Sequence, residues 1–159
     1  MQQKLITFAV PCYNSAAYMR HCIETLLSAG ERAEIILVDD GSVKDDTPAI
    51  CDEYAAKYPT IVKAIHQENG GHGEGVNQGI RNATGLYYKV VDSDDWLTPD
   101  ATEKLVATAE AHQADLVIAD FYRVSGKLVA SKHRVMPVGV MTRREYASKM
   151  MENPASFYY

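Results

Sequence analysis

The sequence has few cysteines and no long apolar run, which argues against a disulfide-stabilised protein and against a membrane-spanning one. Its three cysteines, Cys12, Cys22 and Cys51, form no CxxC pair and leave one unpaired in any disulfide scheme. No stretch approaches the roughly 20 apolar residues of a membrane span, and the N-terminal segment is too short for a signal peptide. We therefore expect a soluble, reduced, cytoplasmic protein, with peripheral attachment to the inner face of the membrane left open.

Positive charge is also scarce. Lys and Arg number 16 against 21 Asp and Glu, a net charge of −5, so the chain has no basic field to hold a nucleic acid. A protein this acidic needs a metal cation or local donors to handle phosphates. Its 159 residues, 47% of them hydrophobic, are enough for one core without disulfides or a structural metal.

Short apolar runs alternate with segments of helical periodicity. The runs predict strands at residues 5–10, 35–38, 61–66, 86–91 and 116–119. Helices are predicted at residues 15–27, 47–58, 76–83 and 98–112, the second and fourth capped by Thr47 and Thr98 before proline. This alternation predicts an α/β fold with a mainly parallel sheet and helices on both faces.

The pattern changes after Asp120. Residues 122–124 and 128–130 flank Ser-Gly-Lys and predict a hairpin, and the capping box from Thr142 to Glu145 predicts a last helix. We therefore divide the chain into an α/β core at residues 1–120 and a hairpin with a helix at residues 121–159.

Three polar loops follow predicted strands, at residues 11–14, 39–42 and 92–95, and parallel strands bring such loops to one edge of the sheet. The third loop has three carboxylates in four residues. Carboxylates so close repel one another, and a divalent cation is the simplest reason to hold them together. Mg²⁺ and Mn²⁺ prefer oxygen ligands and often add substrate phosphates. A solvated turn with acids near a helix N-terminus is the weaker alternative.

The other two loops suggest contacts to a nucleotide base. A carboxylate at residues 39–42 could accept the N–H of a base edge, although Asp and Gly are also ordinary turn residues. Tyr13 could stack on a base, with a packing role as the alternative. Cys12 has no evident His and Asp partners that would make it a nucleophile, so we expect it to be a small buried residue.

The glycine-rich stretch at residues 70–79 matches neither a Walker A motif nor G-x-G-x-x-G. It predicts a flexible loop followed by a helix whose first amides could meet an anion. Asn77 and Arg81 would lie one turn apart on one face of this helix. His66 and His72 have no metal-ligand spacing and are predicted to be surface or loop histidines.

The chain resembles the family-2 inverting glycosyltransferases of GT-A fold over nearly its whole length. The matching segments are Val-Pro-Cys-Tyr-Asn at 10–14, Val-Asp-Asp-Gly-Ser at 38–42, Asn-Gly-Gly at 69–71 with Asn-Gln-Gly at 77–79 and Ala-Thr-Gly at 83–85, and Val-Asp-Ser-Asp-Asp-Trp at 91–96. Four motifs in this order are specific. They imply a Rossmann-like GT-A fold that ends before the acceptor region. They also imply transfer of a sugar with inversion from a nucleoside diphosphate donor, most often a UDP-sugar, to a saccharide or lipid-linked acceptor.

By the same resemblance, residues 92–94 look like the family's DxD motif, with Mn²⁺ or Mg²⁺ bridging the two phosphates. Asp94 is the implied metal ligand and Asp95 its rival. Tyr13 would lie against the base, and Asp40 would accept a hydrogen bond from it. The residues implied to bind the nucleotide sugar are Pro11, Tyr13, Asn14, Asp40, Asn77, Asp92, Ser93 and Asp94.

The chain departs from the family pattern in two places. Where the family often has Ala-Arg-Asn, residues 75–77 are Gly-Val-Asn, and Arg81 and Lys89 are substitutes that do not align with the arginine. The family's general base is an Asp or Glu downstream of the DxD motif and is expected beyond Tyr159. A non-catalytic nucleotide-sugar-binding module is therefore the alternative function. A nucleotidyltransferase is less favoured, because residues 13–15 lack the cations of a phosphate loop.

Overall fold

The computed structural model describes residues 3–98, 100–125, 128–133 and 139–152. The chain divides into two compact units, Met1–Gln113 and Ala114–Tyr159, which we describe separately. The elements of the first unit are β1 (Ile6–Cys12), α1 (Met19–Leu27), the 3-10 turn η1 (Gly30–Arg32), β2 (Ala33–Asp39), α2 (Thr47–Lys57), β3 (Val62–His66), α3 (His72–Asn82), β4 (Tyr87–Val90) and α4 (Ala101–His112).

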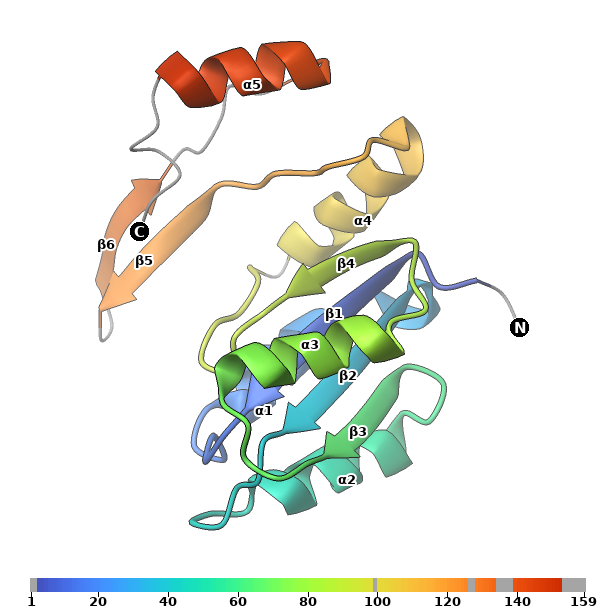
Figure 1. The fold of residues 1–159 in the computed structure, drawn as a ribbon, viewed down its shortest axis with the longest axis vertical. Helices are drawn as coiled ribbons and strands as arrows, with labels where there is room; N and C mark the ends of the chain where they lie inside the picture. The colour runs from blue at the N-terminus through green and yellow to red at the C-terminus, as the bar shows by residue number, and fades with distance from the viewer. Residues whose placement is uncertain (1–2, 99, 126–127, 134–138, 153–159) are drawn as a thin grey trace. The chain divides into compact units, whose positions relative to one another are not determined.

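The strands of this unit form a parallel sheet in the order β3-β2-β1-β4 (Figure 1). Every residue of β1 and β2 is buried, as expected for central strands covered on both faces. The register pairs Cys12 with Asp39 and Asp39 with His66, so these three strands end level with one another. The predicted mainly parallel α/β sheet is confirmed.

Helices cover both faces of the sheet. Phe8 and Val10 of β1, with Ile35 and Leu37 of β2, point into a core shared with α1, α2 and Val106 of α4. Figure 1 shows α3 across the opposite face, where it packs on β1 and β2. Side chains of a strand alternate between faces, so the residues between those of the core face α3.

The helix α3 begins at His72, four residues earlier than predicted, and its glycines serve close packing. A Cβ on Gly75 would lie 3.1 Å from the Cβ of Pro11, and one on Gly79 would lie 2.5 Å from the Cβ of Ala9. These glycines recur one helical turn apart and face β1, so the helix axis can approach the sheet closely. The predicted loop is therefore wrong at residues 72–75, which are helical, because glycine lowers helix propensity without preventing a packed helix.

We expect Gly79→Ala to lower the free energy of unfolding by about 1–3 kcal/mol, the usual cost of overpacking a core. The matched control is Gly73→Ala in the same helix, where an added Cβ meets nothing within 4 Å. It should leave the free energy of unfolding unchanged or raise it by up to about 1 kcal/mol. Urea denaturation measures both, and equal destabilisation of the two variants would contradict the packing argument.

Some predicted element ends are corrected. The first helix begins at Met19 rather than at residue 15. The N-cap of α2 is Asp46 and that of α4 is Asp100, one residue before Thr47 and two after Thr98. The buried Thr47 hydroxyl instead accepts a hydrogen bond from the backbone N–H of Ser15 (2.7 Å), so this threonine ties the start of α2 to the loop after β1.

The second unit contains the antiparallel pair β5 (Phe121–Ser125) and β6 (Leu128–His133), followed by α5 (Arg143–Glu152). The predicted hairpin strands are confirmed, and turn residues 126–127 and the predicted break at 153–154 lie outside the described residues. The capping box is confirmed too, because Thr142 N–H donates to Glu145 Oε2 (2.7 Å) and Glu145 N–H donates to Thr142 Oγ1 (3.3 Å).

The predicted fifth strand at residues 116–119 is wrong. These residues are described and form no strand. Leu116 is 57% exposed and Ile118 37% exposed, so neither lies in a buried layer. A short apolar run indicates a strand only when a neighbouring strand is there to accept its hydrogen bonds, and the run itself carries no information about that neighbour.

Candidate functional site

The loops after β1, β2 and β4 meet at one edge of the sheet, and hydrogen bonds join them. The backbone N–H of Asn14 donates to the Oγ of Ser42 (2.9 Å), which links the first two loops. The hydroxyl of Ser93 donates to the Oγ of Ser15 (3.1 Å), which links the first and third. The structure thus brings together three segments that lie about 30 and 80 residues apart in the sequence.

The loop after β1 presents an aromatic ring to solvent. Tyr13 is 48% exposed, and Asn14 adopts a left-handed conformation (φ 49°) that asparagine tolerates better than most residues. The Oδ1 of Asn14 accepts the backbone N–H of Lys44 (3.0 Å), which fixes this turn. Pro11 is buried against Gly75 of α3, so it supports the loop from behind.

The carboxylate of Asp40 holds the loop that precedes α3. Its Oδ1 accepts the side-chain N–H of Gln67 (2.6 Å) and the backbone N–H of Gly70 (2.8 Å), and its Oδ2 accepts the backbone N–H of Gly71 (2.8 Å). Asp40 is only 3% exposed. Hydrogen bonds to an ionised carboxylate are charge-assisted and therefore strong, and Asp40 accepts three of them. Asp40 therefore organises residues 67–71 in this structure.

The close approach of the loop after β2 to the loop before α3 also requires the glycine that follows Asp40. Gly41 has a φ of 71°, and a Cβ there would lie 2.8 Å from the backbone nitrogen of Asn69. The side-chain amide of Asn69 donates to the carbonyl of Asp40 (3.1 Å). Any other residue at position 41 would strain the turn and displace the loop.

His66, at the end of β3, lies between two carboxylates. Its Nδ1 is 3.0 Å from Asp39 Oδ2, and its Nε2 is 3.1 Å from Asp52 Oδ1 on α2. The other oxygen of Asp39 accepts the backbone N–H of Ser42 (3.0 Å). The hydrogen bond to Asp39, together with the one to Asp52, raises the pKa of His66. The prediction of a surface or loop histidine missed this bridge.

The acidic loop after β4 is held from α3. The Nε2 of His72 is 2.8 Å from Asp92 Oδ1, so the first residue of α3 contacts the first acid of the cluster. Within the part of the chain that the structure describes, the carboxylates of Asp94 and Asp95 have no hydrogen-bond donor. Partial burial of its carboxylate, followed by the charges of Asp94 and Asp92, raises the pKa of Asp95, although the residue as a whole is exposed. The cluster therefore concentrates negative charge that a cation would relieve.

The donor set fits a divalent cation that takes further ligands from a substrate. Asp94 and Asp95 are exposed carboxylates, which are hard oxygen ligands suited to Mg²⁺ or Mn²⁺. Among the described residues, no three imidazole, thiol or carboxylate side chains converge closely enough to hold a metal ion by themselves. Phosphate oxygens would have to complete the coordination sphere.

The cations considered as substitutes for the family's arginine are not equivalent. Arg81 forms an ion pair with Glu74 (2.5 Å), and Asn77 donates to the other oxygen of that carboxylate (3.2 Å). These three residues form a group on the surface of α3. Burial and the charges of Asp94 and Asp92 raise the pKa of Asp95, and the charge of Lys89 on β4 offsets only part of that rise.

The three cysteines are buried thiols. A hydrogen bond with Cys51, followed by burial, raises the pKa of Cys12 well above its usual value. Burial and the nearby Asp95 raise the pKa of Cys22 to about 12. Thiols that stay protonated are poor nucleophiles, which agrees with a packing role for Cys12.

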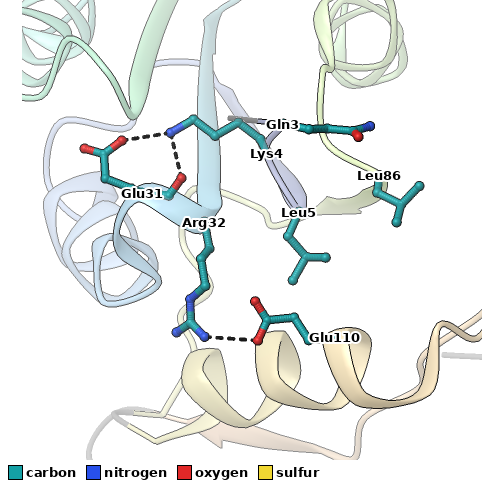
Figure 2. Close-up of a pocket in the computed structure, with 7 residues that line it drawn as sticks. All are labelled: Gln3, Lys4, Leu5, Glu31, Arg32, Leu86 and Glu110. Carbon is teal, nitrogen blue, oxygen red and sulfur yellow. Dashed lines mark hydrogen bonds and ion pairs between the residues drawn. The ribbon is translucent and has the colours of Figure 1, made fainter. Parts of the chain in front are cut away.

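A hollow of about 210 Å³ lies near the opposite edge of the sheet, where β1 and β2 begin (Figure 2). It is lined by Gln3, Lys4, Leu5, Glu31, Arg32, Leu86 and Glu110. Lys4 pairs with Glu31 (3.1 Å) and Arg32 with Glu110 (3.4 Å), so its cations already have partners. The acidic loops and Tyr13 are at the other edge, and the candidate site therefore does not include this hollow.

The chain is similar to proteins that are named as glycosyltransferases. The family model described as "Glycosyl transferase family 2" matches residues 7–157. EpsH of Bacillus subtilis (strain 168) is 41% identical over 122 residues, which cover 76% of this chain and 35% of that protein. The glycosyltransferase GlyG of Streptococcus pneumoniae is 40% identical over 121 residues, which cover 75% of this chain and 40% of that protein.

A crystal structure of S. aureus TarS (residues 1–349) in complex with UDP-GlcNAc has a similar fold. The TM-score is 0.60 at 27% sequence identity, and the match covers 70% of this chain and 32% of that one. The chain thus spans well under half the length of these relatives. None of its described helices is both long enough and apolar enough to cross a membrane.

Proposed function

The chain belongs to glycosyl transferase family 2, and from this premise we propose that it forms the donor-binding part of a glycosyltransferase that uses a nucleoside diphosphate sugar. The donor would be a UDP-sugar, and transfer to a saccharide or lipid-linked acceptor would invert the anomeric centre. In that reaction an acceptor oxygen bonds to the anomeric carbon as its bond to the diphosphate breaks. UDP leaves with the electron pair, and the acceptor proton passes to a general base.

The observation that carries this proposal is the convergence of an exposed aromatic ring and two acidic loops at one sheet edge. A nucleotide needs a stacking surface for its base and a charge-neutralising group for its phosphates, and Tyr13 and the Asp92–Asp95 loop supply candidates for each. The UDP-GlcNAc bound by TarS, a neighbour of similar fold, supports a nucleotide sugar as the ligand.

The proposed binding residues act in three groups. Tyr13, positioned by Pro11 and Asn14, would stack on the base, and Asp40 would accept its N–H. Asp92 and Ser93 would face the ribose and phosphates, with Asn77 of α3 as a further contact. Asp94, with Asp95 as its rival, would hold Mn²⁺ or Mg²⁺. Such a cation, when bound, neutralises the charge that develops on the departing diphosphate.

Isothermal titration calorimetry of UDP with and without Mn²⁺ tests the proposal. We expect UDP to bind and Mn²⁺ to raise its affinity, because a divalent cation relieves the repulsion among the carboxylates of the acidic loop and neutralises the phosphates. CDP and GDP under the same conditions measure base selectivity. The absence of UDP binding, or binding that Mn²⁺ leaves unchanged, would contradict the proposed site.

Replacing Tyr13 by alanine should weaken UDP and UMP binding equally, by about 1–3 kcal/mol, since stacking acts on the base that both share. The matched control is Tyr18→Ala, because Tyr18 is 44% exposed against 48% for Tyr13 but lies at the start of α1. Calorimetry with both nucleotides measures the change. If the two variants bind as the parent does, Tyr13 has only a packing role.

A further inference from the structure

His66 has the geometry of a doubly protonated imidazole. Its two ring nitrogens lie 3.0 and 3.1 Å from the carboxylates of Asp39 and Asp52, at distances typical of hydrogen bonds. An ionised carboxylate only accepts, and a neutral imidazole has a single N–H. Only the imidazolium can donate to both carboxylates at once. Asp39 on β2 and Asp52 on α2 are the charged groups that face this ring in the described chain.

The bridge is connected to the nucleotide-binding edge by successive hydrogen bonds. Asp39, whose side chain is 5% exposed, uses its second oxygen to accept the N–H of Ser42 (3.0 Å). The Ser42 hydroxyl accepts the N–H of Asn14 (2.9 Å), the residue directly after Tyr13. A change at His66 therefore reaches the turn that presents Tyr13 without His66 touching a ligand.

We propose that His66 is a positioning residue whose imidazolium, held between Asp39 and Asp52, fixes the turn after β2 and through it the loop that carries Tyr13. The inference rests on the proposed nucleotide site for its effect on binding. It does not depend on that site for its effect on the fold. Loss of the ring proton leaves one of the two carboxylates facing a lone pair of His66. The imidazole then holds only Asp39 or Asp52, so the turn after β2 is held less firmly.

The stabilisation that His66 provides is expected to decrease as the pH rises. The pKa of His66 is raised above the ordinary value of 6.5, with the hydrogen bond to Asp39 as the main cause. The stabilisation is then complete below about pH 6.5 and is lost as the pH rises through the higher pKa of the folded state. UDP affinity should fall over the same interval.

The first measurement is an NMR titration of the histidine ring nitrogens, with His66 assigned by its absence in His66→Gln. We expect both ring nitrogens of His66 to be protonated at pH 6.5 and its midpoint to lie above that pH. Asp52→Asn removes one charge and should shift the midpoint downward. A His66 ring that is neutral at pH 6.5, or a midpoint unchanged in Asp52→Asn, would overturn the proposal.

The second measurement is UDP affinity as a function of pH. At pH 6, His66→Gln should bind UDP about 3–10-fold more weakly than the parent, with a flatter pH profile, because it loses a charge-assisted hydrogen bond. His66→Arg keeps a charge and several donors at every pH, so it should retain affinity and also flatten the profile. His112→Gln, at the end of α4, is the matched control and should keep the parental profile.

The two measurements separate the two proposals. If UDP binds neither the parent nor the variants, the proposed function fails, and the NMR titration still decides whether His66 is a charged bridge. If UDP binds the parent and His66→Gln with the same affinity and the same pH profile, the positioning role is wrong.

Discussion

Asp94→Asn is expected to abolish the gain in UDP affinity that Mn²⁺ provides, while leaving the fold unchanged. The substitution is nearly isosteric, and the Asp94 side chain is exposed with no hydrogen-bond donor among the described residues, so folding loses little. The neutral amide lacks the charge that a hard divalent cation requires. The loss should exceed the roughly 10–100-fold that removal of an outer-shell partner costs a metal site.

Calorimetry with UDP at several Mn²⁺ concentrations measures this loss, and thermal unfolding without ligand shows that the fold persists. Asp95→Asn is the informative companion, because Asp95 is the next acid of the same loop and the charge of Asp94 acts on it. Asp46→Asn, an exposed acid at the start of α2, is the control and should behave as the parent. Unchanged metal dependence in Asp94→Asn combined with its loss in Asp95→Asn would move the ligand to Asp95.

The sheet was predictable because its signals are local. The four strands of the parallel sheet are short apolar runs, and the central runs end at Pro11 and Asp39, where polar loops begin. Parallel pairing then places those loops at one edge without further information. The family-2 resemblance is confirmed by the family model that matches residues 7–157. The assignment of single residues to base, ribose and metal stays a prediction.

Contacts between loops were not predictable, because they depend on how distant turns approach one another. His66 and His72 looked like unremarkable loop histidines, yet each has a carboxylate partner that is 20 or more residues away. The early start of α3 was not predicted, because its glycines look like loop residues in the sequence. Their packing against β1 explains why they occur in a helix. Conversely, the apolar run at residues 116–119 carried a strand signal, and no strand among the described residues pairs with it.

Asp40→Asn should have the second largest effect, and it acts first on stability. The amide offers one acceptor oxygen where the carboxylate offers two, and its NH₂ would face a donor from Gln67, Gly70 or Gly71. Loss of a hydrogen bond to a charged acceptor costs roughly 1.5–3 kcal/mol, and the burial of Asp40 favours the upper part of that range. Urea denaturation measures the change, with Asp46→Asn as the exposed control.

The same variant separates two roles that Asp40 could have in binding. If its carboxylate accepts the N3–H of uracil, the preference for UDP over CDP should shrink in Asp40→Asn, because cytosine has no proton at N3 and loses nothing. If Asp40 only anchors residues 67–71, both nucleotides should bind more weakly by the same factor, and the ratio should stay as in the parent. Three donors already occupy this buried carboxylate, so a base that binds to it must displace one of them or use a remaining lone pair. Base recognition by Asp40 therefore predicts that UDP changes the hydrogen bonds that Gly70 and Gly71 donate to this carboxylate, either by displacing one or by adding a further donor. Amide chemical shifts of Gly70 and Gly71 that UDP leaves unchanged would assign Asp40 to the loop alone.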